Sequence, residues 1–95
     1  MINATAELDA AEALALNALA HLLGEPDRVA RFLAATGFGE AELRQHVGDA
    51  TFLGGVLDFV LQDEALLLEV AASVECRPEG VMRARRRLPG APLDE

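Results

Sequence analysis

The segment ATFLGGVLDFVL, residues 50–61, carries one charged side chain, Asp58, and apolar residues on nearly every side of a helix. A helix that is apolar around most of its circumference must be covered by other elements, so we expect these residues to form a buried central helix. Alternation of apolar and polar residues with a period of two is missing, and β-branched residues are sparse. The segment therefore predicts an all-α fold.

Turn and capping residues divide the rest of the chain into further helices. Pro26 and Pro78 stand where a first helical residue belongs, Gly37 stands where a helix stops, and Asp49 and Asp63 are suited to cap helix N-termini. We expect helices over residues 6–23, 25–36, 40–47, 50–61, 64–74 and 78–88. In the first of these, a periodic stripe faces inward: Leu8, Ala11, Ala15, Leu19 and Leu22. The predicted architecture is a compact single-domain bundle of five to six short helices over residues 1–88, followed by a flexible C-terminal tail over residues 89–95.

A weak internal repeat relates two parts of the chain. Residues 25–44 align with residues 63–82, and in this register Phe32 matches Val70 and Leu43 matches Val81. Each part would form a helix-turn-helix, so the bundle can be divided into two such halves around the central helix. Helical hairpins share apolar patterns for physical reasons alone, so duplication and mere similarity both stay open.

Composition limits the class of protein. A chain of 95 residues has room for one core, and 52% hydrophobic residues are enough to build it. The formal net charge of −8 disfavours nucleic acid as a partner. Cys76 is the only cysteine, residues 1–8 have no basic region before an apolar run, and no segment has the roughly 20 apolar residues of a membrane span. We therefore expect a cytoplasmic protein with no membrane association.

Four strings in order, EALALNALAHL, RFLAATGFGEAELR, FLGGVLDFVLQDEALLLEV and VMRARRRLPG, resemble a family of small bacterial proteins, the domain-of-unknown-function family numbered 3572. The resemblance extends from about Glu12 to Gly90, and its most specific part runs from Phe52 to Val70. The chain departs from the family pattern at residues 74–76, where a glycine turn is expected. The resemblance implies no catalytic residue, cofactor or activity.

Catalytic and metal-binding patterns are missing from the sequence. His21, His46 and Cys76 do not stand three or four residues apart, as two ligands on one helix face would. No glycine-rich phosphate loop or serine-centred nucleophile motif occurs. We therefore expect no metal, no cofactor and no enzymatic activity.

Asp58 is the one acid that stands out as a weak pocket candidate. With Gly54 four residues before it and Gln62 four residues after it, Asp58 forms a narrow polar stripe on the apolar helix. The stripe could line a pocket, face water or pair with an arginine. Gly54 and Gly55 each destabilise a helix by about 1 kcal/mol relative to alanine, which favours a close helix crossing as their purpose.

Arginines and surplus leucines suggest an interaction surface. Residues 77–88 contain Arg77, Arg83, Arg85, Arg86 and Arg87 against one acid, Glu79. On residues 64–74 the predicted inward face is Leu67, Val70, Ala71 and Val74, which leaves Leu68 exposed, and Leu14 lies outside the stripe of the first helix. These residues predict a noncatalytic interaction module that contacts an acidic protein partner or a second copy.

Two other interpretations of these residues remain. A nucleic-acid-binding helix-turn-helix would need Arg83, Arg85, Arg86 and Arg87 displayed together without acidic partners, although Glu75 occupies a turn position that favours glycine. Alternatively, the arginines pair with acids of neighbouring helices and the last helix covers the leucines.

Overall fold

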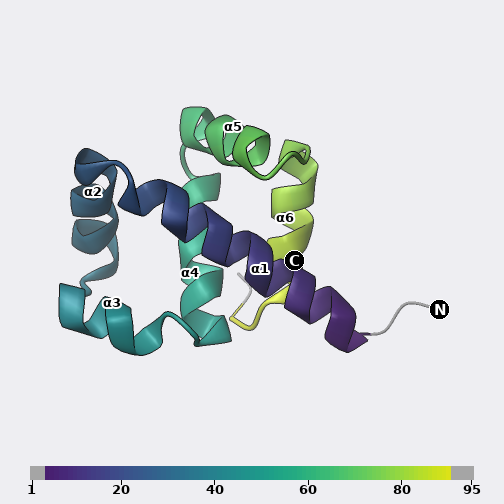
Figure 1. Ribbon diagram of the computed structural model, residues 1–95, viewed down its shortest axis with the longest axis horizontal. Helices are drawn as coiled ribbons and strands as arrows, with labels where there is room; N and C mark the ends of the chain where they lie inside the picture. The colour runs from purple at the N-terminus through teal and green to yellow at the C-terminus, as the bar shows by residue number, and fades with distance from the viewer. Residues whose placement is uncertain (1–3, 91–95) are drawn as a thin grey trace.

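Six helices form within residues 4–90, the part of the chain whose backbone the computed structural model describes; side chains are described for residues 8–39 and 41–90. They are α1 (Ala4–Leu23), α2 (Pro26–Thr36), α3 (Glu40–His46), α4 (Ala50–Leu61), α5 (Glu64–Ser73) and α6 (Pro78–Arg87) (Figure 1). No strand occurs in this part of the chain, so the predicted all-α bundle is confirmed. None of its helices is long and apolar enough to cross a membrane.

The predicted start and stop residues act as expected. α2 and α6 each begin at a proline, and the side chain of Asp49 accepts a hydrogen bond from the Thr51 N–H at 3.0 Å. Asp63 accepts one from the Leu66 N–H at 3.2 Å. These local signals explain why every helix boundary within residues 4–90 lies within two residues of its predicted position.

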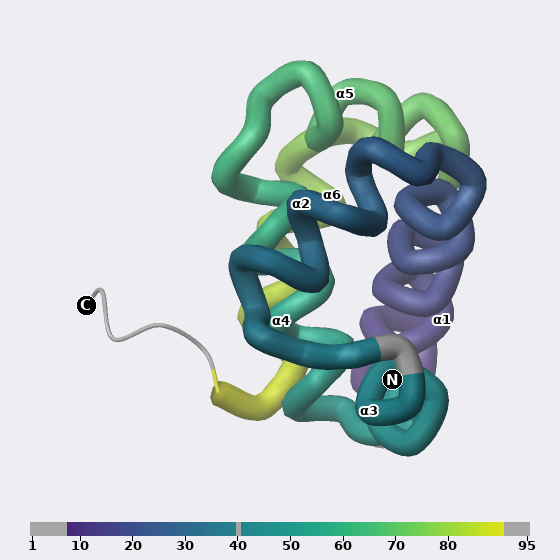
Figure 2. The backbone as a smooth tube through the Cα atoms, turned by 90° about the vertical axis from the view of Figure 1, so that its left-hand side faces the viewer, coloured from purple at the N-terminus to yellow at the C-terminus, as the bar shows by residue number. Residues whose placement is uncertain are grey.

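α4 is the centre of the core, as its sequence predicts. α1 crosses it, and α5 and α6 also pack on it (Figures 1 and 2). Phe32 of α2 adds edge-on contacts with the rings of Phe52 and Phe59, with centroids 6.1 and 5.3 Å apart. The buried residues of α4 are Phe52, Leu53, Gly54, Val56, Leu57 and Val60.

α1 packs alongside α6 as well as across α4. Its predicted inward stripe is buried at Ala11, Ala15, Leu19 and Leu22, and Leu8 packs partly buried against the same core. Small alanine side chains let a helix approach its neighbours closely. The first and last helices of the described chain therefore lie side by side.

The turns of the two helix pairs, α2–α3 and α5–α6, each contain a left-handed residue. Gly37 and Glu75, which the internal repeat aligns, are both left-handed, with φ of 79° and 58°. A left-handed glutamate is unusual, and two backbone bonds support it: the N–H of Cys76 donates to the Ala71 carbonyl at 2.9 Å and that of Glu75 to the Ala72 carbonyl at 3.2 Å. In each pair a turn with a left-handed residue joins two helices, and in the second pair glutamate stands at the turn position that favours glycine.

Candidate interaction site

Arg85 is not part of the protein surface, contrary to prediction. Its side chain lies on the face of α6 that packs on α4, and the residue is only 5% exposed. Its Nε donates to Asp58 Oδ1 at 2.6 Å and its Nη2 to Asp58 Oδ2 at 3.1 Å. Asp58 is thus paired with a buried arginine, which was one of the three alternatives for this acid. Arg85 does not belong to the interaction surface predicted from the sequence.

Gly54 makes room for this guanidinium. A Cβ atom at position 54 would lie 2.9 Å from Arg85 Nη1 and 3.0 Å from the carbonyl oxygen of Pro89. The close contact at Gly54 is therefore with a side chain of α6 and with the chain that follows α6, rather than the direct crossing of two helices predicted from the glycines. At Gly55 a Cβ would meet nothing within 4 Å, so close packing does not explain the second glycine.

The same guanidinium also holds the chain beyond α6. Arg85 donates to the carbonyl oxygens of Leu88 and Pro89, each at 3.3 Å, and to that of Gly90 at 2.6 Å. These bonds attach Pro89 and Gly90, the first two residues of the predicted flexible tail, to the bundle. Residues 91–95 of that tail lie outside the described residues.

An apolar groove between α1 and α6 brings together three of the predicted interaction residues, Leu14, Arg83 and Arg87. The groove has a volume of about 340 Å³. It exists because small side chains of the two helices face one another and leave space that larger ones would fill. Its lining consists of Ala10, Ala11 and Leu14 from α1 and Gly80, Arg83, Ala84 and Arg87 from α6.

The other predicted interaction residues do not line this groove. Arg86 is exposed on α6, and Leu68 is 52% exposed on α5. The prediction that Leu67 rather than Leu66 belongs to the inward face of α5 is wrong, because Leu66 is fully buried and Leu67 only half-buried. Three consecutive leucines span about 200° of a helix, so their order alone does not determine which one faces the core.

A second groove, which the sequence analysis missed, lies at the C-terminal end of α1, where it meets α2 and α3. It has a volume of about 380 Å³, and two of its side chains are well exposed, Leu23 at 50% and Val47 at 37%. The sequence did contain a signal, because Leu23 ends α1, Val47 directly follows α3, and both are apolar residues outside the predicted inward stripe. The lining residues are Leu19, Leu23, Val29, Leu43, Arg44 and Val47.

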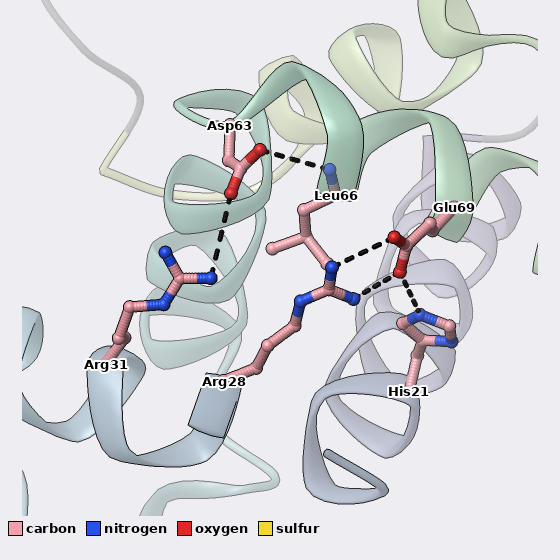
Figure 3. Close-up of polar contacts among 6 residues, drawn as sticks. All are labelled: His21, Arg28, Arg31, Asp63, Leu66 and Glu69. Atoms are coloured by element: carbon pink, nitrogen blue, oxygen red, sulfur yellow. Dashed lines mark hydrogen bonds and ion pairs between the residues drawn. The ribbon is translucent and has the colours of Figure 1, made fainter. Parts of the chain in front are cut away.

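A polar cluster fastens α5 to α1 and α2 (Figure 3). Arg28 of α2 binds both carboxylate oxygens of Glu69, one of them through Nη2 to Oε2 at 2.9 Å, and His21 Nε2 lies 3.2 Å from Glu69 Oε1. The hydrogen bonds from Arg28, and then from His21, lower the pKa of Glu69 to about 2. Arg31 and Asp63 form a longer ion pair at 4.0 Å beside the cluster. These contacts join α5 to α1 and α2.

The two histidines and the cysteine take part in separate contacts. His46 pairs with Asp49 at 3.8 Å, and the Cys76 thiol donates to the Arg77 carbonyl at 3.3 Å. Burial raises the pKa of Cys76, which disfavours the reactive thiolate. Among the described residues no group of three or more histidine, cysteine, aspartate or glutamate side chains could hold a metal ion.

Comparison with known proteins identifies the family. The family model described as "Protein of unknown function (DUF3572)" matches residues 8–91 of the 95-residue chain. No curated protein and no solved structure matches the chain. The match covers all six helices from the second turn of α1 onward, and the chain therefore belongs to the DUF3572 family of proteins of unknown function.

Proposed function

We propose that this protein is a noncatalytic interaction module whose α1–α6 groove binds an acidic, amphipathic segment of a protein partner. The observation that carries the proposal is the composition of the groove, which has an apolar floor and two arginines along one side. An amphipathic helix buries its apolar side chains in such a groove and leaves charged ones at the rim. Arginine at the rim favours acidic residues there.

Arg83 is the residue on which recognition would depend most. It is exposed, lines the groove, and forms no ion pair with any described residue. Its charge is thus available to a ligand carboxylate, in contrast to the charge of Arg85, which Asp58 neutralises. The partner segment we expect has leucine or alanine on one face and glutamate or aspartate beside it.

The proposal includes a cytoplasmic location and no catalytic role. A single half-buried cysteine with a raised pKa suits a reducing compartment. Every buried side-chain nitrogen and oxygen among the described residues has a hydrogen-bond partner. Such satisfied groups are typical of structural contacts, whereas strained or perturbed groups in a cleft are typical of catalytic sites.

Nucleic acid is the competing ligand, because α5 and α6 form a helix-turn-helix pair. That function would have to use Arg83, Arg86 and Arg87 without Arg85, against the net charge of −8. The two ligands differ in which arginines they need. A phosphate backbone attracts every exposed arginine of α6, whereas a segment in the groove depends on the arginines that line it.

Binding of model ligands tests the proposal. The probe is a labelled amphipathic peptide of about 15 residues, with leucine and alanine on one face and glutamate beside it, measured by fluorescence anisotropy; a peptide with lysine in place of glutamate and a DNA duplex are compared. We expect the acidic peptide to bind. Arg83→Glu should weaken binding roughly tenfold or more, the loss expected for a charge-assisted contact turned repulsive.

Arg86→Glu is the matched control, since it makes the same charge change on the same helix outside the groove. It should weaken binding by only about twofold, through long-range charge alone. Equal effects of the two variants, tighter binding of the lysine peptide, or preferential binding of DNA would contradict the proposal.

A further inference from the structure

We propose that a second copy of this chain supplies the acidic segment, so that the exposed face of α5, centred on Leu68, docks into the α1–α6 groove of a neighbouring copy. This inference rests on the proposed function of the groove. The proposed occupant is a surface of this same chain that the fold leaves exposed.

The exposed face of α5 has the chemistry that the groove requires. Leu68, 52% exposed, is flanked by exposed Ala65 and Ala72, so it stands as one apolar side chain between small ones. Glu64 lies one turn before it on α5, and Glu75 lies in the turn that follows the helix; both are exposed. Neither glutamate forms an ion pair with another described residue.

The groove is complementary to this face in shape and charge. Gly80, Ala84 and Ala10 leave a depression into which a leucine side chain can insert, and Arg83 provides positive charge at its edge. A leucine inserted between small residues of two facing helices is a knob in a hole. With Leu68 seated, Glu64 of the same helix lies within reach of the arginine side of the groove, because it is one turn away along the helix.

The two surfaces belong to different parts of one molecule. Figure 1 shows α5 along the upper edge and the α1–α6 contact below it. A pair of copies joined by one such contact is heterologous and leaves one groove and one α5 face free, so association continues to rings or chains. A pair in which each copy places its α5 face in the groove of the other closes as a symmetric dimer. We expect a contact of the weak class, with Kd on the order of 10⁻⁴ M, because one leucine and its neighbouring side chains form it.

Sedimentation velocity from about 10 μM to about 1 mM tests the proposal, since this range spans the expected Kd. The mass of the wild type should rise with concentration above that of a monomer. Arg83→Glu, which blocks the groove, and Leu68→Glu, which blocks the α5 face, should each remain monomeric. Leu16→Glu, a matched change at another exposed leucine of 42% exposure, should associate like the wild type.

Mixing the two monomeric variants gives the decisive result. The intact groove of Leu68→Glu should accept the intact α5 face of Arg83→Glu, giving a 1:1 heterodimer that grows no further. A wild type that is monomeric up to about 1 mM, variants that still associate, or a mixture without heterodimer would overturn the inference. Circular dichroism and urea midpoints of the exposed-site variants establish that they are folded.

The acidic-peptide assay separates this failure from failure of the groove. The assay uses Leu68→Glu, which retains its groove. If this variant binds the acidic peptide while the wild type stays monomeric, the proposed function of the groove stands and the second copy is excluded as its occupant. Loss of both peptide binding and association would overturn both proposals.

Discussion

Replacing Arg85 with alanine should destabilise the protein more than any change at an exposed arginine. Arg85 is 5% exposed, and its guanidinium bonds to both oxygens of Asp58 and to three backbone carbonyls. Removing one partner of a buried ion pair destabilises a protein by about 3–5 kcal/mol, and the Asp58 side chain, 35% exposed, can recover some hydration. We therefore expect a loss of about 3 kcal/mol, against a total stability of about 5–15 kcal/mol.

Urea unfolding followed by circular dichroism measures this loss. With a slope of about 1 kcal/mol per M, the midpoint should fall by about 3 M, whereas Arg83→Ala should change stability by less than about 0.5 kcal/mol. Asp58→Ala and the double variant complete a cycle in which the two effects should not add. A loss below about 1 kcal/mol for Arg85→Ala, or full additivity, would refute the idea that this pair secures α6 on α4.

Three further predictions follow from particular positions. Gly54→Ala should destabilise by about 1–3 kcal/mol, because its Cβ would meet the guanidinium at 2.9 Å, whereas Gly55→Ala, with open space, should stabilise by up to about 1 kcal/mol in the same urea assay. Glu75→Gly should raise the free energy of unfolding by about 0.5–1 kcal/mol by relieving a left-handed φ of 58°; Glu75→Ala, which keeps a Cβ, should not. The pKa of Glu69 is lowered to about 2, so its contribution to stability is present above the ordinary glutamate pKa of 4.5 and is lost as pH falls toward 2. Glu69→Gln should therefore reduce the dependence of the urea midpoint on pH over that range, and Glu64→Gln should not.

The helices were predictable because their signals are local. The apolar run of α4, the prolines at the starts of α2 and α6, and the capping side chains of Asp49 and Asp63 act on residues within one turn. The register of the repeat aligns Gly37 with Glu75, and both residues are left-handed, although glutamate at that position spoke against such a turn. No tertiary information was needed for these features.

The candidate site was predicted only in part, because it depends on how faces of distant helices meet. Arg85 stands four residues after Val81 and three before Leu88, both buried, so helical spacing did contain a signal that it faces the core. The sequence analysis instead grouped Arg85 with the four other arginines of residues 77–88 as one surface. The groove itself could not be predicted, since nothing in the spacing of Ala10 or Gly80 shows that α1 and α6 lie side by side.

The contact between α1 and α6 also bears on the order in which the chain folds. The α5–α6 turn joins residues near in sequence, whereas packing α1 on α6 brings together the two ends of the described chain. Contacts between distant residues require closure of a long loop before they contribute any stability. We therefore expect α4, α5 and α6 to associate early and α1 to dock late, so that the alanine-rich face of α1 governs how fast the protein unfolds rather than how fast it folds.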